Sequence, residues 1–395
     1  MNIRILLLLI FFLVFSCKPE NKAGKEDAQP VAEKSPALNT SGDRNLLTPY
    51  DPDTLKPGQI RIGLLVSQHP DGRDISLSAW QNAALAVREL NHSAAKNNKK
   101  IVLIVRSCDG PWGMGSTQAV NMAYKDSVTS IVASANGRNS HLIEQVVAKT
   151  HTPVVSAWAT EPTLTEAFVP WFFRLVPNDR QQAQALADEI FKKGNNNKTS
   201  LISFGDYDSR QAARAFYQLV KKNGYNSPDT MDYEVMGKDP EIAARHIARS
   251  QAGSVLFMGH PVETKQIIDA LLPIDKEITF YGNSWLASSG NLLYTTNASI
   301  PLKIISPSFT VNEAGNKFIN DFMTAYGYKP DAAAAYAYDG IRLLYEAIRN
   351  AGTGQSALRD YIHTMHFDGI TGDIQFDKHG NLVSGIELMK CGVKP

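Results

Sequence analysis

Small polar residues follow two of the apolar runs in this 395-residue chain, and their chemistry suits the binding of a ligand. Residues 134–140 come after the run that ends at Ala133, just before a predicted helix, and residues 156–162 come after the run that ends at Val155. Backbone N–H groups at the start of a helix favour an anion such as a carboxylate. The alternative is that these residues only cap helices and make turns. In these two segments the candidate ligand contacts are Asn136, Gly137, Asn139, Ser156, Ala159 and Thr160.

Three later segments offer further polar and aromatic groups after apolar runs. Residues 205–209, 259–263 and 282–285 each follow a predicted strand. Taken singly, each has the pattern of a capped turn rather than of a ligand contact, since Asp208 and Ser209 have side chains typical of helix N-caps. The candidate ligand contacts in these segments are Asp206, Tyr207, His260, Ser284 and Trp285.

Catalytic chemistry has little support in the sequence. The chain has no Gly-x-Ser-x-Gly elbow, His-Glu-x-x-His helix, Walker loop or Gly-x-Gly-x-x-Gly pattern after its first strand. His260 with Glu263 or Asp208 would make an acid and base pair, but nine histidines and 39 acidic residues make such coincidences common. We therefore predict that the protein is not an enzyme and needs no cofactor.

The three cysteines do not form a metal-binding pattern. Neither a Cys-x-x-Cys motif nor a His/Cys cluster is present, so a structural zinc site is not expected. Cys108, beside Asp109, is either a reactive thiol or a buried or disulfide-bonded residue. Cys391 is the residue that could pair with it in an oxidising compartment.

Apolar runs of strand length alternate with helical stretches along most of the chain. This alternation predicts parallel sheets that are covered by helices on both faces. It occurs in two series of roughly 120 residues, which predicts an α/β fold with two doubly wound parallel-sheet lobes and ligand contacts beyond the carboxyl ends of the strands. The predicted strands are 60–66, 101–105, 130–133, 153–156, 200–204, 233–235, 255–258, 278–281, 372–376 and 385–389, and the predicted helices include 141–149, 240–250, 263–272, 314–326 and 332–350.

The N-terminus has the pattern of an export signal. Arg4 precedes the apolar residues 5–15, a run too short to span a bilayer, which needs about 20 residues. Residues 14–17, Val-Phe-Ser-Cys, resemble a bacterial lipobox, which implies that Cys17 carries a lipid anchor; the alternative is a signal that is cut close to Cys17. Residues 18–57 have little apolar surface, so we predict a flexible spacer.

The overall composition excludes some partners. Hydrophobic residues make up 43% of the chain and charged residues 20%, which is ordinary for a globular protein. The net charge is +1, and binding to nucleic acid or to an anionic surface would need a concentrated basic face. We therefore expect no nucleic-acid partner.

From about residue 59 onward the chain resembles the type I periplasmic binding proteins, in the leucine/isoleucine/valine-binding branch that serves ABC importers. The resemblance implies a hinged clamshell with one lobe formed by 58–177 and 308–369 and the other by 178–307 and 370–395. It also implies three chain crossings, near 176–179, 305–308 and 369–372. The patterns that carry it lie at 60–65, 83–91, 153–165, 173–182, 337–344 and 367–372, in the order and spacing of the family.

The first lobe matches the family's binding elements. In amino-acid-binding relatives this lobe holds the carboxylate of the ligand and part of its ammonium. Residues 156–160 match that element, as does the segment with Gly137 and Asn139, and Asp179 matches the Asp that follows the first crossing.

The second lobe departs from the family pattern. Residues 283–285, Asn-Ser-Trp, stand where relatives place an acidic residue, and His260 replaces a frequent aromatic. An unpaired buried ammonium costs several kcal/mol. Either Asp206, Asp208 or Glu263 therefore pairs with an ammonium, or the ligand is not an α-amino acid.

Three further residues gain a meaning from the resemblance. Trp158 and Trp285 either flank an aromatic or apolar ligand or pack against their own lobes. Relatives pair a cysteine at the position of Cys108 with one near Asn136, and this second cysteine is missing here. The resemblance thus implies an unpaired Cys108 and does not favour Cys391 as its partner.

Signal, spacer and resemblance together predict an extracytoplasmic solute-binding protein. It would capture a small polar or carboxylate-bearing molecule and deliver it to an ABC permease, while Cys17 anchors it to the extracytoplasmic, periplasm-facing side of a bacterial membrane. One alternative keeps the fold but makes the protein a ligand-sensing regulator of the cell envelope. Another is a hydrolytic enzyme.

Overall fold

The computed structural model describes residues 46–47, 58–67, 75–93, 99–193, 198–274, 277–288, 301–310, 312–386 and 388–390. Every described residue belongs to one compact unit, Glu33–Pro395. The predicted signal with Cys17 lies outside the described residues, as do Cys391 and nearly all of the predicted spacer. In the described part of the chain, no helix is both long and apolar enough to cross a bilayer.

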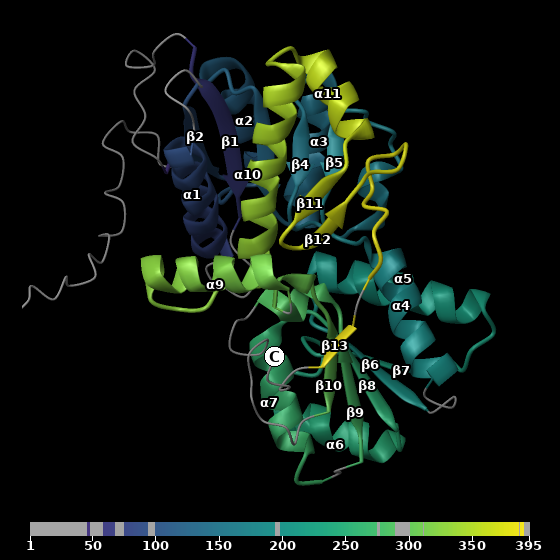
Figure 1. Cartoon of the computed structure of the whole chain (residues 1–395). Helices are drawn as coiled ribbons and strands as arrows, with labels where there is room; N and C mark the ends of the chain where they lie inside the picture. Colours follow the sequence, from purple (N-terminus) through teal and green to yellow (C-terminus); the bar gives the residue numbers. More distant parts are fainter. Residues whose placement is uncertain are drawn as a thin grey trace, which may run out of the picture. The chain divides into compact units, whose positions relative to one another are not determined.

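Five parallel strands form the first sheet, in the order β2-β1-β3-β4-β5 (Figure 1). β1 is central, with Ile62 opposite Leu103 on one side and Ser130 on the other. Its sequence is almost continuously apolar because both faces of the sheet are covered. The strands are β1 (Ile60–Val66), β2 (Ile101–Ser107), β3 (Ser130–Ser134), β4 (Val154–Ser156) and β5 (Phe172–Arg174).

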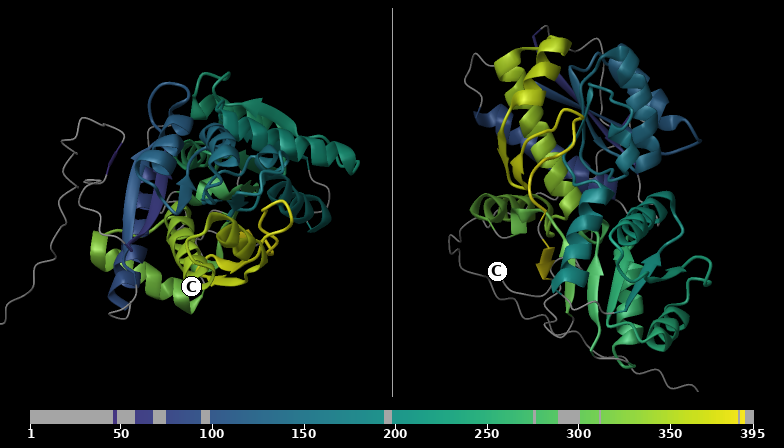
Figure 2. Two further views of the ribbon diagram at one scale, coloured as in Figure 1. Left: turned by 90° about the horizontal axis from the view of Figure 1, so that it is seen from above. Right: turned by 90° about the vertical axis from the view of Figure 1, so that its right-hand side faces the viewer.

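Helices cover both faces of this sheet. Alternate residues of β1 point to opposite faces, so Leu64 packs in the core with α1 and α10, and Leu65 packs in the core with α2 and α3. α1 and α10 lie against each other (Figure 1, Figure 2). The helices are α1 (Ile75–Ser93), α2 (Met114–Val120), α3 (Gly137–Thr150) and, from the C-terminal part, α10 (Ala332–Ala351) and α11 (Gln355–Thr364).

The second sheet has six strands, in the order β13-β10-β9-β8-β6-β7. All neighbours are parallel except β13, which runs antiparallel to β10. The strands are β6 (Thr199–Ser203), β7 (Asp229–Asp232), β8 (Ser254–Met258), β9 (Thr279–Gly282), β10 (Leu302–Ile305) and β13 (Leu388–Lys390).

The second sheet is also covered on both faces. Leu256 of β8 packs with α4 and α5, while its neighbour Phe257 packs with α6 and α7. The prediction of two doubly wound parallel-sheet lobes is therefore confirmed. These helices are α4 (Asp179–Ala187), α5 (Tyr207–Lys222), α6 (Pro240–Ser250) and α7 (Pro261–Leu271), and α9 (Glu313–Tyr326) follows β10.

One predicted strand is misplaced. We predicted a strand at 233–235, but β7 ends at Asp232, and Val235 is exposed in the turn that follows. β7 is the edge strand of its sheet and carries two aspartates, so the apolar pattern that identifies central strands does not mark it. The short strands β5 and β10 and the helix α11 were not predicted, because each has too few apolar residues to show a period.

The third crossing also differs from the prediction at 369–372. That segment is a tight turn between two short antiparallel strands, β11 (Phe367–Gly369) and β12 (Gly372–Ile374). Asp339 of α10 holds the turn, since its carboxylate accepts hydrogen bonds from the N–H groups of Ile370 and Thr371 and from the Thr371 hydroxyl.

Beyond this turn the chain remains with the first sheet. Asn381 forms a parallel bridge with Arg174 of β5. Of the residues described after this turn, only those of β13 pair with the second sheet, so the crossing lies between Leu382 and Leu388. Residues 370–382 therefore belong with the first lobe and not, as predicted, with the second.

Two residues of the predicted spacer pair with β2. Leu46 forms an antiparallel bridge with Arg106 and is buried, and the Leu47 N–H donates to Val105 O at 2.9 Å. The adjacent leucines supply the apolar surface that makes this contact favourable.

A buried ion pair stabilises the same edge of the first sheet. The Arg106 side chain is fully buried, and its Nε and Nη2 donate to the two carboxylate oxygens of Asp126 at 2.5 and 2.9 Å. Its Nη1 donates to Gln118 Oε1 at 3.0 Å. All the charge of this guanidinium is thus compensated inside the protein.

We predict that Asp126→Ala lowers the free energy of unfolding by about 3–5 kcal/mol, because it leaves a buried guanidinium without its anion. The exposed pair of Asp269 with Lys265 on α7 is the control, and Asp269→Ala should change it by less than about 1 kcal/mol. Urea unfolding of both variants measures the difference. Equal losses would contradict the prediction.

Candidate functional site

Several buried polar atoms without partners gather at the carboxyl ends of strands. They come from the ends of β3 and β4, from the loop after β4, from the start of α4 and from the residue after β9. A buried polar group without a hydrogen bond costs about 1–3 kcal/mol, so such groups need a specific reason to persist. Those without a partner among the described residues are Ser134 Oγ, Ser156 Oγ, Trp158 Nε1, both oxygens of Asp179, and Nδ2 and Oδ1 of Asn283.

Asp179 is the most costly of these groups. Its side chain belongs to a residue that is only 2% exposed, and its backbone N–H donates to Thr160 O at 2.8 Å. Burial raises the pKa of Asp179 to about 7, against the opposing effects of the Thr160 hydroxyl and the Arg174 charge. The Thr160 hydroxyl is near but does not form a well-directed hydrogen bond with the carboxylate, since both oxygens lack a partner.

Arg174 is a buried cation whose charge acts on the carboxylate of Asp179. Its Nη1 donates to Glu161 O at 2.6 Å and more weakly to Ala159 O, and its Nη2 donates to Thr165 Oγ1 at 3.1 Å. Burial lowers the pKa of Arg174 to about 10, and the nearby acids, Asp179 first, act against that shift. The guanidinium is therefore positioned by neutral oxygens rather than by a direct ion pair with Asp179.

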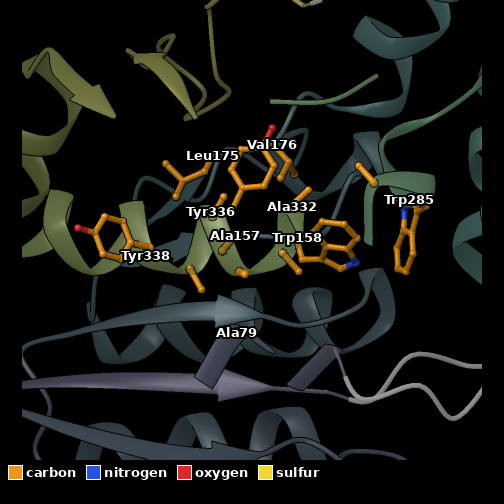
Figure 3. Packing of buried hydrophobic residues seen from close by; sticks show 14 of the residues in the cluster. Ala79, Ala157, Trp158, Leu175, Val176, Trp285, Ala332, Tyr336 and Tyr338 are labelled. Carbon is orange, nitrogen blue, oxygen red and sulfur yellow. The ribbon is translucent and has the colours of Figure 1, made fainter. Parts of the chain in front are cut away.

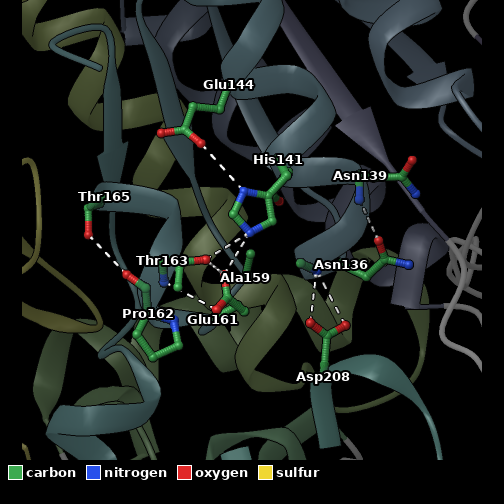
Figure 4. Close-up of polar contacts among 12 residues, drawn as sticks. Asn136, Asn139, His141, Glu144, Ala159, Glu161, Pro162, Thr163, Thr165 and Asp208 are labelled. Carbon is green, nitrogen blue, oxygen red and sulfur yellow. Dashed lines mark hydrogen bonds and ion pairs between the residues drawn. The ribbon is translucent and has the colours of Figure 1, made fainter. Parts of the chain in front are cut away.

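The start of α3 is bound by a carboxylate from the second lobe. Asn136 caps this helix by accepting the Asn139 N–H at 2.9 Å. The next N–H group, that of Gly137, donates to both oxygens of Asp208, at 3.0 and 3.3 Å (Figure 4). Burial, followed by the charges of Asp206 and Asp179, holds the pKa of Asp208 well above its usual range.

His260 is held in place by an acid and a ring of its own lobe. Its Nε2 lies 2.8 Å from Asp206 Oδ2, and its Nδ1 lies 3.8 Å from Glu263. The imidazole stacks on Phe204 with 4.9 Å between the ring centres. Asp206 is also the N-cap of α5, where it accepts the Ser209 N–H, so this cap is Asp206 and not Asp208 or Ser209.

A second histidine pairs with an acid of the first lobe. His141 Nε2 lies 2.7 Å from Glu161 Oε2, and its Nδ1 lies 3.5 Å from Glu144 (Figure 4). Hydrogen bonds with Glu144 and Glu161 raise the pKa of His141 to about 9. Burial acts to raise the pKa of Glu161, but hydrogen bonds from His141 and Thr163 bring it below its usual value.

Two tryptophans join the lobes at the same place (Figure 3). The rings of Trp158 and Trp285 meet edge to face, 5.3 Å apart, within a core that continues through both lobes. Trp285 Nε1 donates to Thr160 Oγ1 of the first lobe at 3.2 Å. Within the second lobe, Ser284 N donates to Gln182 Oε1 at 2.9 Å. The two tryptophans therefore contact each other across the lobes instead of packing only against their own.

A cavity of about 560 Å³ opens between α3 and the start of α5. Three arginines and two aspartates line it, so its charge is mixed. Among the described residues no group of three or more His, Cys, Asp or Glu is arranged to hold a metal ion. The lining residues are Asn136, Arg138, Gly205, Asp206, Tyr207, Asp208, Arg210, Gln211 and Arg214.

The structure brings most of the predicted ligand contacts to this boundary. Of the first-lobe candidates, Asn139 serves the helix cap and Ala159 supplies a carbonyl to Arg174. The remaining candidates either line the cavity or lie at the contact between the lobes: Asn136, Gly137, Ser156, Thr160, Asp179, Asp206, Tyr207, His260, Ser284 and Trp285. Their roles as ligand contacts stay predictions.

The sequence analysis did not anticipate four features of the boundary. These are the cross-lobe contact of Asp208, the unpartnered amide of Asn283, the buried Arg174 and the pair of His141 with Glu161. Asn283 stood beside two candidates and was noted only as the loss of an acidic residue. Cys108 is free and buried, as the resemblance implied, and burial raises the pKa of its thiol.

The raised pKa of Asp179 predicts a pH dependence of stability. Between pH 4 and pH 7 the folded protein keeps a proton that the unfolded chain, with a pKa near 3.8, has lost. The stabilisation by this proton is therefore lost as the pH rises through about 7. The unfolding free energy of Asp179→Asn minus that of wild type should therefore increase by about 2–4 kcal/mol between pH 4 and pH 8, as measured by urea unfolding. A parallel pH profile for the two proteins would contradict this.

Comparison with known proteins agrees with this architecture. Residues 59–392 match the family model described as periplasmic binding protein. The Leu/Ile/Val-binding protein BraC3 of Rhizobium johnstonii is 21% identical over 307 residues, which cover 76% of this chain and 83% of that protein. Glutamate receptor 3.1 of Oryza sativa subsp. japonica is 22% identical over 385 residues, and this chain, 83% covered, spans 40% of the receptor.

A solved structure extends the similarity to the fold. The branched-chain amino acid transporter substrate binding protein LivJ from Streptococcus pneumoniae, solved with isoleucine, matches with a TM-score of 0.70 at 19% identity. The match covers 84% of this chain and 96% of LivJ. Because the family match spans most of the chain, the protein belongs to the periplasmic binding protein family, in its type I, leucine-binding-like branch.

Proposed function

We propose that this protein captures a small polar solute, an amino acid or a related compound, between its two lobes and delivers it to an ABC importer. The observation that carries the proposal is the group of unpartnered buried polar atoms contributed by both lobes. Ser134 and Ser156 offer theirs at the ends of β3 and β4 in the first lobe. Asp179 at the start of α4 and Asn283 after β9 offer theirs from the second lobe. A solute that satisfies these atoms supplies the hydrogen bonds that the protein lacks.

Such a solute favours contact between the lobes. A ligand shifts a conformational equilibrium only by its difference in affinity for the two states. A molecule that bonds with Ser156 of the first lobe and with Asp179 and Asn283 of the second makes all its contacts only when the lobes meet. Lobe contact thereby becomes a signal that a membrane partner can read.

The relatives support the solute class and the partner. BraC3 is a Leu/Ile/Val-binding protein by name, and LivJ was solved with isoleucine. We extend this class to the present chain and propose an ABC permease as its partner. We further propose a position outside the cytoplasm with a lipid on Cys17, supported by the signal pattern at the N-terminus.

The test is to identify the natural solute. The protein is purified from its native host, denatured, and the released small molecules are identified by mass spectrometry. The identified compound should raise the melting temperature of ligand-free protein, and this rise should grow with the logarithm of the ratio of compound concentration to Kd. Cells without the protein should lose uptake of that compound. A protein that releases nothing, responds to no solute and is not needed for uptake would disprove the proposal.

We predict that Asn283→Leu lowers affinity for the identified solute about 10- to 100-fold, because the solute loses the partners that the amide offers. Leu has nearly the shape of Asn and removes two unpartnered buried atoms, so the unfolding free energy should stay within about 1 kcal/mol or rise. Calorimetric titration and urea unfolding measure the two quantities. Asn320→Leu, on the exposed side of α9, is the matched control and should change neither. Unchanged affinity in Asn283→Leu would remove Asn283 from the site.

A further inference from the structure

A carboxylate of the protein itself occupies an anion site at the boundary, the start of α3. Backbone N–H groups at a helix start attract anions, and the N–H of Gly137 opens α3 at this point. Both oxygens of Asp208 bond to it, and Asp208 is only 3% exposed. A carboxylate on a bound solute would have to displace this contact to use the same N–H group.

Asp208 and Tyr207 pack closely against Gly137. A Cβ atom placed on Gly137 would clash with Asp208 Oδ1 and would lie 3.3 Å from Tyr207. The guanidinium of Arg138 lies 5.1 Å from the centre of the Tyr207 ring. Asp208 and Tyr207 therefore cover Gly137 itself, and the cavity opens beside Asn136 and Arg138.

Two acids at the boundary are not bonded to a histidine. Among the four acids at the boundary, Glu161 is bonded to His141 and Asp206 to His260. Asp179 and Asp208 are left, and Arg174 is the one buried cation that acts on Asp179. Three arginines line the cavity beside Asp208, but no described side chain bonds to the carboxylate of Asp179. A buried carboxylate in this situation favours a cationic partner.

Asp179 is the acid with free oxygens. Both are buried and unpartnered, whereas the oxygens of Asp208 are engaged with Gly137. Thr160 links Asp179 to the tryptophans, because its carbonyl accepts the Asp179 N–H and its hydroxyl accepts the Trp285 N–H. Aromatic rings next to an acid suit an organic cation, which gains both a charged hydrogen bond and contact with the rings.

We infer that the solute is a small organic cation, an amine or amidine, that bonds to Asp179 beside the Trp158 and Trp285 pair and carries no carboxylate, because Asp208 occupies the N–H group of Gly137. This inference rests on the proposed solute-binding function and names the class of solute. It separates this protein from relatives such as LivJ, whose isoleucine carries a carboxylate.

The experiment uses amino acids and the amines that differ from them only by loss of the carboxylate. The pairs are leucine with isoamylamine, phenylalanine with phenethylamine, lysine with cadaverine and arginine with agmatine. Calorimetric titration of the full exported protein should show binding of at least one amine at least 10-fold tighter than its amino acid. In Asp179→Asn that amine should bind about 10- to 100-fold more weakly. The control Asp269→Asn, an exposed change on α7, should bind it as wild type does.

Two variants of Asp208 isolate the effect of the filled anion site. Asp208→Ala exposes the Gly137 N–H, so the amino acid of the pair should gain affinity, about 10-fold or more, relative to the amine. Asp208→Asn keeps an oxygen that can accept the same N–H and should gain much less. Circular dichroism and urea unfolding establish that both variants fold. Equal gains in the two variants would show that charge, rather than occupation of the N–H group, sets the preference, and would overturn this part of the inference.

The outcomes distinguish a failure of the inferred solute class from a failure of the proposed solute-binding function. Amino acids that bind wild type as tightly as their amines, or a natural solute without a cationic group, overturn the inference and leave solute binding intact. A calcium or zinc salt that binds while no amine does overturns it as well. A protein that binds neither the panel nor any compound from its host loses both the inference and the proposed function.

Discussion

A carboxylate withdrawn from water must be protonated, hydrogen-bonded or paired with a cation, and this constraint determines the chemistry of the boundary between the lobes. Four acids meet it there in different ways. Glu161 and Asp206 are bonded to histidines, and Asp208 accepts a backbone N–H from the opposite lobe. Asp179 has no such partner, and burial raises its pKa to about 7. The group that the protein leaves unsatisfied is the group most able to select a solute.

The cross-lobe contacts explain why selectivity can rest on few residues. Asp208 to Gly137 and Trp285 to Thr160 are both made by the protein itself. Under the proposed function the Trp285 contact forms with every solute and does not discriminate between solutes, whereas the Asp208 contact disfavours solutes with a carboxylate. The remaining discrimination rests on the atoms that these contacts leave unpartnered, above all the carboxylate of Asp179 and the amide of Asn283.

The fold could be predicted from the sequence because it depends on local patterns. The apolar run at β1 and the spacing of α6 correspond closely to the structure, since central strands and amphipathic helices carry their own signal. The edge strand β7 and the crossing near Leu382 carry none. The loops at the strand ends could be predicted as the site, but the contacts between their residues could not. From the sequence, Asp208 is a candidate helix N-cap. Its contact with Gly137 depends on how the two lobes meet, which local sequence patterns do not show.

The way the two lobes meet also determines whether the start of α3 can bind an anion of the solute. The family resemblance implies that the first lobe of relatives holds the carboxylate of the ligand, and that the segment with Gly137 at the start of α3 matches part of this element. Here Asp208 already makes that connection, and a solute carboxylate would compete with a group tethered to α5 at high effective concentration. A solute without a carboxylate avoids this competition and leaves the contact of Asp208 with Gly137 intact. Under this inference Asp208, a single aspartate of the second lobe, sets which solutes bring the two lobes together.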